Sequence, residues 1–307
     1  MIMPTQQNTA TPQPITIKDL QTINPLWCAG CGDFGITMGL KRFIVDKQLQ
    51  PHITINVSGI GCSGRAPNYY QTYGIHGIHG RALTLATGVA LTRPDLNLFV
   101  HSGDGDALSI GGNHLIHGVN KNFKCVFILY DNELYALTKN QTSPTTRKSH
   151  PTNTQPQGTF LDPLNAVRLV LGMGGSFVAS TADWMPDHLA SILKLAFDHK
   201  GFAFVHISQR CPHFDPNAFD HKTSNWFSFL AHEKGVPADK RLADKTEVIQ
   251  HDPTDLQAAF KYAADEKRYY GIFYLNKDKP SYDAIMRDTV KNAKPKDRKT
   301  ILDKFVI

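Results

Sequence analysis

The sequence predicts an α/β fold built on a doubly wound, mostly parallel sheet. Two short apolar runs, residues 98–100 and 126–130, have the length and the β-branched or aromatic content of buried strands. A Gly-rich turn at 103–106 follows the first run, and residues 110–119 between the runs have a helical pattern. This order of strand, turn, helix and strand is a βαβ unit, whose ligands bind at the carboxyl ends of the strands.

The other predicted elements continue this alternation along the chain. Further strands are predicted at 53–57 and 201–207, and further helices at 36–45, 83–91 and 184–199. Pro186 falls in the first turn of the last helix, where proline is tolerated. Residues 161–163 open one more helical region. Because both added strands end in turns that contain Gly or Cys, we expect these turns beside the 103–106 turn.

The chain divides into three parts by composition. Residues 1–20 are polar and rich in Pro and Thr, which predicts a flexible arm. Residues 21–215 hold the predicted sheet and its ligand sites, and residues 216–307 form a C-terminal extension. An apolar patch in the extension either packs on its own domain or covers a partner subunit, and we favour the partner. The patch consists of Trp226, Phe227, Phe229 and Leu230.

Composition excludes several classes of protein. No run of about 18 apolar residues is present, so no membrane-spanning helix is predicted, and the first 20 residues do not resemble a signal peptide. We therefore expect a cytoplasmic protein whose five cysteines are metal ligands or free thiols rather than disulfides. The net charge of +6 is dispersed, and no nucleic-acid-binding motif is visible. The Lys and Arg residues that give this charge form either a solvated surface or a docking face for an acidic redox protein.

Two oxygen-bearing side chains follow neighbouring strands of the predicted sheet. Asp104 lies in the turn after the first strand of the βαβ unit, and Asn132 follows the second strand. A carboxylate and an amide oxygen suit Mg²⁺, which leaves its remaining positions to phosphates and water. Gly103 and Gly105 let the backbone approach a diphosphate. A plain tight turn would also explain the glycines, but not the asparagine at the next strand end.

Four of the five cysteines fall in predicted loops near Gly or Pro. Cys28 and Cys31 form a Cys-x-x-Cys loop, and Cys62 and Cys211 follow predicted strands. Four such thiolates could bind one zinc ion or one [4Fe–4S] cluster, and their spacing does not separate the two. Cys125 begins a predicted strand and is expected to be a core thiol.

The central motifs carry a family resemblance. The Gly-Asp-Gly at 103–105 with the Asp-Asn at 131–132 resembles the thiamine diphosphate motif. Two flanking segments resemble the β subunit of 2-oxoacid:ferredoxin oxidoreductases. They are Gly-Gly-Asn-His-Leu-Ile-His from Gly111 and Gln-x-Ser-Pro-Thr-Thr from Gln141. Ala136 and Asn140 depart from the glycines that are usual in that family.

The resemblance implies roles for residues by their position in these motifs. Asp104 and Asn132 would hold Mg²⁺ with the backbone carbonyl of Leu134, and Cys28, Cys31, Cys62 and Cys211 would hold one [4Fe–4S] cluster. The residues expected around thiamine diphosphate are Ile60, Gly61, Cys62, Ser63, His79, Gly105, Asp106, Leu134, Ala136 and Thr138. Because zinc carries no electrons, the position of Cys62 beside the cofactor favours the cluster.

The resemblance implies a reversible, thiamine-dependent oxidative decarboxylation. A 2-oxoacid and coenzyme A would give acyl-CoA and CO₂, with electrons passing through the cluster to ferredoxin. No second thiamine domain is visible, so activity is expected only with an α subunit, in an (αβ)₂ assembly. The segment from Gly61 to Ala82 is most similar to the 2-oxoglutarate branch. Arg65 is expected to bind the substrate carboxylate, unless it pairs with a local acidic residue.

Three alternatives remain open from the sequence. The first is a pyruvate-specific member of the same family. The second is a non-redox thiamine decarboxylase subunit with a zinc site made by the four cysteines. The third is a binding module in which the basic chain holds a partner or nucleic acid and performs no chemistry. The expected enzyme binds neither nucleic acid nor a membrane.

Overall fold

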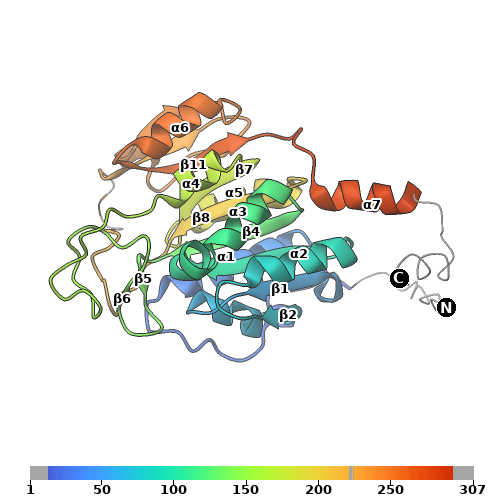
Figure 1. Ribbon diagram of the computed structural model, residues 1–307, viewed down its shortest axis with the longest axis horizontal. Coiled ribbons are helices and arrows are strands. Elements are labelled where there is room, and N and C mark those ends of the chain that lie inside the picture. Colours follow the sequence, from blue (N-terminus) through green and yellow to red (C-terminus); the bar gives the residue numbers. More distant parts are fainter. Residues whose placement is uncertain (1–12, 221–222, 224, 293–307) are drawn as a thin grey trace, which may run out of the picture.

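The computed structural model describes residues 13–220, 223 and 225–292. In this part of the chain, nine strands form one sheet in the order β10-β9-β11-β7-β8-β4-β3-β1-β2 (Figure 1). The strands are β1 (Thr54–Ser58), β2 (Tyr73–His76), β3 (Asn97–Gly103), β4 (Cys125–Asp131), β7 (Phe177–Ala182), β8 (Phe202–Ser208), β9 (Phe227–Ala231), β10 (Glu247–Gln250) and β11 (Arg268–Leu275). A separate hairpin pairs β5 (Leu134–Tyr135) with β6 (Gln141–Thr142).

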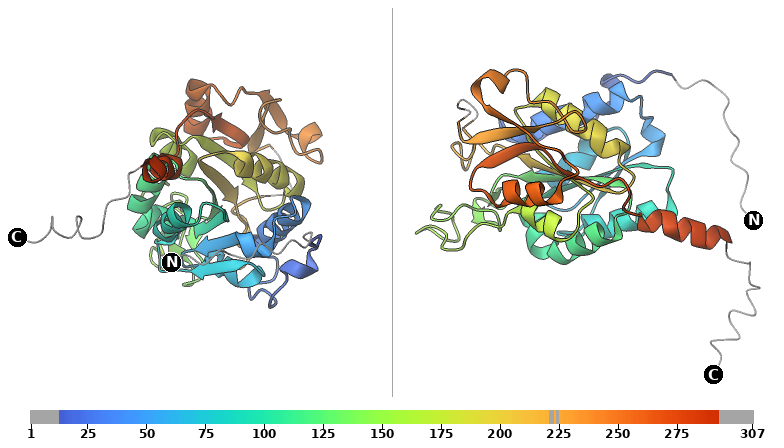
Figure 2. Two further views of the ribbon diagram at one scale, coloured as in Figure 1. Left: turned by 90° about the vertical axis from the view of Figure 1, so that its right-hand side faces the viewer. Right: turned by 90° about the horizontal axis from the view of Figure 1, so that it is seen from above.

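Helices cover both faces of the sheet, as the doubly wound prediction requires. Strands β3 and β4 direct alternate side chains to opposite faces: Val100 and Phe127 join one apolar cluster, and Phe99 and Ile128 join the other. The right-hand view of Figure 2 shows helices on either side of the strands. One cluster includes α1 (Gly32–Asp46) and α5 (Pro186–Asp198), and the other includes α2 (Ala82–Thr92), α3 (Gly112–Lys121), α4 (Ala166–Gly172) and α6 (Leu256–Ala264).

The register of the parallel strands places their carboxyl ends at one edge. Ser58 pairs with His101, Gly103 with Tyr130, and Asp131 with Ser208. The loops that follow β1, β3, β4 and β8 therefore leave the sheet side by side. Sheet direction reverses at β11, which is antiparallel to β7 but parallel to β9.

Several predicted boundaries differ from the structure. The helix predicted at 110–119 is preceded by a π-helix, Asp106–Ile110, and the α-helical part starts at Gly112. Strands β2, β7, β9, β10 and β11 were not predicted. Residues 13–20 do not form a free arm: Ile15 and Leu20 are buried, and the Ile15 N–H donates to Gln48 Oε1 at 2.9 Å. Residues 1–12 of that predicted arm lie outside the described residues.

The apolar patch of the C-terminal extension was assigned wrongly to a partner subunit. Phe227, Phe229 and Leu230 belong to β9 and are buried within their own chain. Phe227 and Phe229 pack with Tyr270 and Met185, because β9 pairs with β11 inside the large sheet. The extension also contains α7 (Tyr282–Asn292), which projects from the body of the domain (Figure 1). Among the described helices, none has the length and apolar character needed to cross a membrane.

Candidate functional site

The loops at the carboxyl edge enclose a cavity of about 120 Å³ beside Asp104, called here the Asp104 cavity. Each residue predicted to contact the cofactor lines it, together with Asp104 and Asn132. Those residues are Ile60, Gly61, Cys62, Ser63, His79, Gly105, Asp106, Leu134, Ala136 and Thr138. They come from the loops after β1, β2, β3 and β4, so the parallel register explains why they meet.

Asp104 is buried and shares a hydroxyl with a second carboxylate. Its Oδ2 accepts from Ser143 Oγ at 2.5 Å and lies 2.7 Å from Thr145 Oγ1, which is also 2.8 Å from Asp131 Oδ1. The threonine has only one proton to donate. Burial, and next the charge of Asp131, raise the pKa of Asp104 to about 8. A divalent cation in the cavity would favour the ionised form of Asp104, so this carboxyl fits a metal site.

Asp131 keeps its charge for a different reason. Burial is the largest single influence and acts to raise its pKa, but the hydrogen bond and charge of His206, together with Arg268 and Thr145, lower that pKa overall. His206 Nε2 lies 2.9 Å from Asp131 Oδ2, and its Nδ1 lies 2.9 Å from Ser180 Oγ. Asp131 is therefore a fixed negative charge behind Asp104.

Two hydrogen bonds fix the orientation of the Asn132 side-chain amide. Its Nδ2 donates to Gln209 Oε1 at 2.8 Å, and its Oδ1 accepts from the Leu134 N–H at 3.1 Å. A carbonyl oxygen has two acceptor sites, so Oδ1 retains one for a cation. Asp104 and Asn132 both line the Asp104 cavity, and their side-chain oxygens are of the hard kind that Mg²⁺ prefers.

Asp106 organises the loops rather than facing the cavity with its carboxylate. Oδ1 accepts from the N–H groups of Ile60 at 3.0 Å and Gly80 at 2.6 Å and lies 2.6 Å from His79 Nδ1. Oδ2 accepts from Ser102 Oγ at 2.5 Å. A methyl group at Gly59 would lie 2.0 Å from Oδ2, so this turn requires glycine. Any contact of Asp106 with a diphosphate is therefore left to its backbone.

A second cavity, of about 240 Å³, is lined by all four predicted ligand cysteines and is called here the cysteine cavity. Cys62, Asn132 and Gln209 line both cavities, so the two share a wall. Burial, followed by the charge of Asp33, raises the pKa of Cys62 to about 12 and that of Cys31 further. Cys125 lies apart in β4, buried, as expected of a core thiol.

The arrangement of the cysteines bears on the kind of centre that they could hold. Within the described residues, no group of three or more His, Cys, Asp or Glu side chains is placed to hold a metal ion. All four cysteines nevertheless line the same cavity, and bound zinc would require each sulfur at about 2.3 Å from the metal. Cys28 is exposed and Cys211 is buried, so the cavity extends from the surface inward.

Arg65 lies in the cysteine cavity and not in the Asp104 cavity. In the part of the chain that the structure describes, it forms no ion pair with Asp or Glu. Its charge acts to lower the pKa of Cys62, against the stronger effect of burial. The alternative that Arg65 pairs with a local acid is therefore not what the structure shows.

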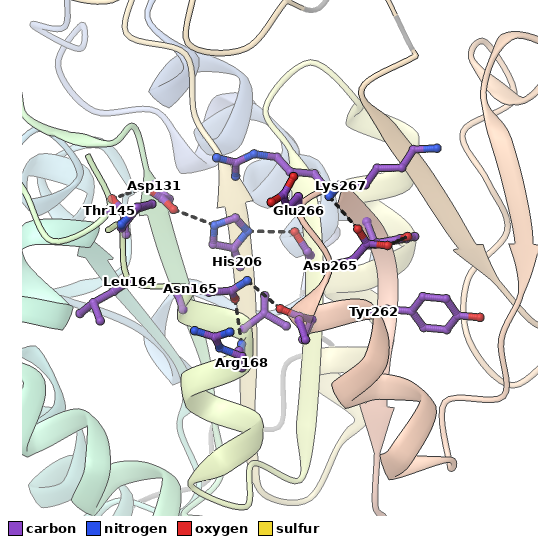
Figure 3. Close-up of a pocket in the computed structure, with 18 of the residues that line it drawn as sticks. Asp131, Thr145, Leu164, Asn165, Arg168, His206, Tyr262, Asp265, Glu266 and Lys267 are labelled. Atoms are coloured by element: carbon purple, nitrogen blue, oxygen red, sulfur yellow. Dashed lines mark hydrogen bonds and ion pairs between the residues drawn. The ribbon is translucent and has the colours of Figure 1, made fainter. Parts of the chain in front are cut away.

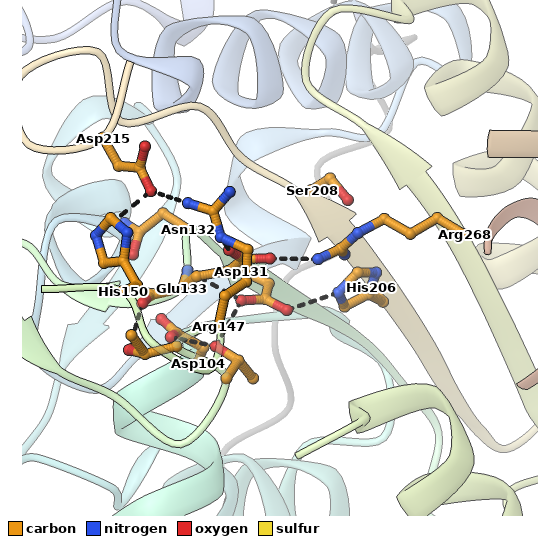
Figure 4. A network of polar contacts seen from close by, with 12 residues as sticks. Asp104, Asp131, Asn132, Glu133, Arg147, His150, His206, Ser208, Asp215 and Arg268 are labelled. Atoms are coloured by element: carbon orange, nitrogen blue, oxygen red, sulfur yellow. Dashed lines mark hydrogen bonds and ion pairs between the residues drawn. The ribbon is translucent and has the colours of Figure 1, made fainter. Parts of the chain in front are cut away.

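A polar network fixes the turn that carries Asn132 (Figure 4). Glu133, adjacent to Asn132, is buried and has a positive φ of 63°. Its carboxylate pairs with Arg147 Nε at 2.8 Å and with Arg268 from β11. Arg147 also pairs with Asp215. Sequence reasoning missed these residues because ion pairs between distant segments leave no local pattern.

A third cavity, of about 300 Å³, lies behind this network (Figure 3). Asp131, Thr145 and His206 line one side, and Asp265 and Lys267 line another. Its charged groups are largely paired within the protein: Lys267 Nζ lies 2.8 Å from Glu247 Oε2, and Asp265 accepts from Tyr269. Residues of α4, α6 and the start of β11 contribute to the rest of its lining.

Comparisons with known proteins agree with the geometry. The family described as "Thiamine pyrophosphate enzyme, C-terminal TPP binding domain" matches residues 59–207. The family that describes the C-terminal part of the "Pyruvate ferredoxin oxidoreductase beta subunit" matches residues 239–291. The lining of the Asp104 cavity lies within the first match except for Gln209, whereas of the four ligand cysteines only Cys62 does. The second covers β10, α6, β11 and most of α7.

Similar individual proteins are known from several organisms. The chain is 44% identical over 211 residues to the 2-oxoglutarate oxidoreductase subunit KorB of Mycobacterium tuberculosis, covering 68% of this chain and 57% of that relative. It is 36% identical over 265 residues to a 2-oxoacid:ferredoxin oxidoreductase subunit beta of Sulfolobus, covering 84% of each.

A solved structure of "2-oxoglutarate:ferredoxin oxidoreductase from Magnetococcus marinus with 2-oxoglutarate, coenzyme A and succinyl-CoA bound" has the same fold. Its chain matches with a TM-score of 0.84 and 32% identity, over 96% of this chain and 97% of that one. Sequence, fold and site geometry lead to one conclusion: the chain belongs to the family of 2-oxoacid:ferredoxin oxidoreductase β subunits.

Proposed function

We propose that this chain is the thiamine diphosphate-binding β subunit of a 2-oxoglutarate:ferredoxin oxidoreductase. The observation that carries the proposal is the shared wall between the Asp104 cavity and the cysteine cavity, to which Cys62 contributes. A cofactor that releases electrons and a centre that accepts them would then be neighbours.

The Asp104 cavity would hold thiamine diphosphate through Mg²⁺. Asp104, Asn132 and the Leu134 carbonyl would bind the cation. Gly105, Thr138 and the backbone at Asp106 would contact the diphosphate, and Ile60, Gly61, Ser63 and Ala136 would border the rest of the cofactor. Because Asp106 accepts from the N–H groups of Ile60 and Gly80, it would keep the cavity in shape before the cofactor binds.

The cysteine cavity would hold one [4Fe–4S] cluster through Cys28, Cys31, Cys62 and Cys211. Cys62 lies on the wall shared with the Asp104 cavity, and this position favours a redox cluster over a zinc ion, because zinc carries no electrons. The neighbouring cations Arg65 and Lys139 would partly balance the negative charge of a thiolate-bound cluster.

When bound, thiamine diphosphate would supply the carbanion chemistry that releases CO₂ from a 2-oxoacid. The protein would contribute position, charge and proton control. Asp106 holds His79 by Nδ1 at 2.6 Å, which leaves Nε2 of this cavity-lining side chain free to accept a proton. Electrons would leave through the cluster to ferredoxin, and the acyl group would pass to coenzyme A.

The choice of 2-oxoglutarate rests on the relatives and on one basic residue. Arg65 has no acidic partner among the described residues, so its guanidinium is available to a carboxylate. Arg65 lines the cysteine cavity, whereas the substrate would bind beside the cofactor in the Asp104 cavity. Arg65 would therefore reach the substrate only past the wall that the two cavities share. If Arg65 serves the substrate, Arg65→Ala raises KM for 2-oxoglutarate; if it serves the cluster, the variant lowers the reduction potential instead.

An α subunit would complete the site, in an (αβ)₂ assembly. Exposed apolar side chains stand at and near the mouth of the Asp104 cavity: Ile60 is 37% exposed, Leu137 39% and Ile78 75%. Such side chains on site loops suit a covering protein surface. The C-terminal extension would contribute to the same contact, through surface other than the buried residues of β9.

The test is an anaerobic purification of the chain together with its α subunit. We expect a brown complex with equal iron and sulfide and with retained thiamine diphosphate, whose visible absorbance bleaches with 2-oxoglutarate and coenzyme A. Bleaching by pyruvate alone would support the pyruvate-specific alternative, and stoichiometric zinc without bleaching would support the non-redox decarboxylase. Asp104→Ala should lose thiamine diphosphate; if wild type retains none, a binding module is the better description.

A further inference from the structure

Gln209 is one of five described residues that line both the Asp104 cavity and the cysteine cavity. It follows β8 directly and is 1% exposed. Its backbone N–H donates to the Asp131 carbonyl at 2.9 Å, one residue before Asn132. The position is therefore fixed relative to β4 and to the turn that carries the candidate metal ligand.

The contacts of Gln209 determine which end of its amide faces which cavity. Its Nε2 lies 2.6 Å from the Arg210 carbonyl oxygen, which can only accept, so this atom must be the nitrogen. The second N–H of the same nitrogen points to Cys31 Sγ at 3.4 Å. Oε1 is left to face Asn132 Nδ2 at 2.8 Å.

The orientation of Asn132 follows from that of Gln209. Because Gln209 presents an acceptor, Asn132 must present its nitrogen to Gln209 and its oxygen to the other side. There, Oδ1 meets the Leu134 N–H at 3.1 Å, a group that can only donate. Each hydrogen bond in this series therefore has a defined donor and acceptor, from Leu134 through Asn132 and Gln209 to the sulfur of Cys31.

We propose that Gln209 is a positioning residue that couples the two cofactor centres. Through Oε1 it would hold the Asn132 oxygen toward Mg²⁺, and through Nε2 it would donate a hydrogen bond to the cluster-bound thiolate of Cys31. This inference rests on the proposed function. It differs from that function in giving one side chain an effect on both centres.

Both effects have a physical basis. Partners that orient a metal ligand typically change metal affinity by about 10–100-fold when removed. Hydrogen bonds to cluster sulfurs help to set the reduction potential. A donor stabilises the reduced cluster more than the oxidised one, since the reduced form carries more negative charge. Loss of the Gln209 N–H should therefore lower the potential.

Two substitutions separate the two contacts. Gln209→Leu removes both, and should weaken Mg²⁺ binding about 10–100-fold and lower the cluster potential. Gln209→Glu keeps an oxygen for Asn132 but places the other oxygen against the Arg210 carbonyl and Cys31. It should leave Mg²⁺ affinity close to wild type and still lower the potential. Gln250→Leu, on the exposed edge strand β10, is the matched control and should change neither quantity.

The experiment uses the complex with the α subunit. Mg²⁺ affinity is measured by titrating MgCl₂ and thiamine diphosphate into chelator-treated protein, and the potential by an anaerobic redox titration followed by electron paramagnetic resonance. Unchanged values of both in a folded Gln209→Leu complex would overturn the inference while leaving the proposed function intact. If that variant does not assemble, an unshifted potential in Gln209→Glu overturns it. A wild-type complex without iron or without bound thiamine diphosphate overturns both proposals.

Discussion

The carboxylate of Asp106 provides a direct test of how the loops of the Asp104 cavity are held. Asp106→Ala removes the acceptor for the N–H groups of Ile60 and Gly80 and for His79 Nδ1. The His79 side chain is 36% exposed and can turn to water. The penalty therefore falls on the two amides and on the buried Ser102 hydroxyl, which donates to the same carboxylate, at roughly 1–3 kcal/mol each, or about 3–9 kcal/mol in total.

Asp106→Asn should cost much less. One oxygen remains for the same three donors, and the new amide nitrogen can face Ser102, whose hydroxyl can rotate to accept. The variant loses the charge but leaves no amide unpaired, so we expect a cost below about 1.5 kcal/mol.

Hydrogen exchange of individual amides measures this difference. A loss of about 2 kcal/mol or more should speed exchange at Gly80 by roughly 30-fold or more in Asp106→Ala, and by less than about tenfold in Asp106→Asn. Amides of α5, on the other face of the sheet, should exchange as in wild type. Equal acceleration at Gly80 in the two variants would show that the carboxylate does not hold this loop as described.

Four further outcomes follow from the structure. In the proposed site Mg²⁺ would bind the ionised carboxyl of Asp104, whose pKa is raised to about 8, so calorimetric Mg²⁺ affinity should rise roughly tenfold per pH unit up to about pH 8 and then level; a flat profile would contradict this. The same raised pKa should make the metal-free protein lose stability as pH rises from the ordinary range of a carboxyl towards 8, and Mg²⁺ should reverse the loss in thermal melts. Gly105→Ala places a methyl 2.2 Å from Tyr135 Cε1 and should weaken thiamine diphosphate binding, whereas Gly88→Ala, where nothing lies within 4 Å, should stabilise α2 by about 0.5–1 kcal/mol in urea unfolding. Cys62→Ser should lose iron and Cys125→Ser should retain it; iron retained in the first variant would remove Cys62 from the ligand set.

Local sequence patterns predicted the central strands well because those strands are buried on both faces. β1, β4 and β8 are buried along their whole length; β4 and β8 consist mostly of apolar residues, and β1 follows the β-branched run of Ile53 to Val57. β2 was missed because it is an edge strand with mostly exposed residues. β7 was missed because Ala, Ser and Thr form much of its buried length, and these small residues give no apolar run.

The candidate site was predictable to the extent that strand ends meet at one edge. That rule brought Asp104, Asn132 and Cys62 together. It could not show that Arg65 lies on the cysteine side of the wall, because a loop residue can point either way. Nor could it show the ion pair between Glu133 and Arg268, which are 135 residues apart, or the part taken by Gln209, whose importance depends on which atoms of its amide face which neighbour.

The reversal of strand direction at β11 has a consequence for engineering this protein. Because β9, β10 and β11 run opposite to the other strands, they begin at the edge that holds both cavities and finish at the far edge. Arg268 is the first residue of β11, so it lies at the same edge as Glu133 and pairs with it. The turn after β9, residues 232–235, lies at the far edge. A tag or a fluorescent reporter grafted there would leave every wall of the two cavities untouched.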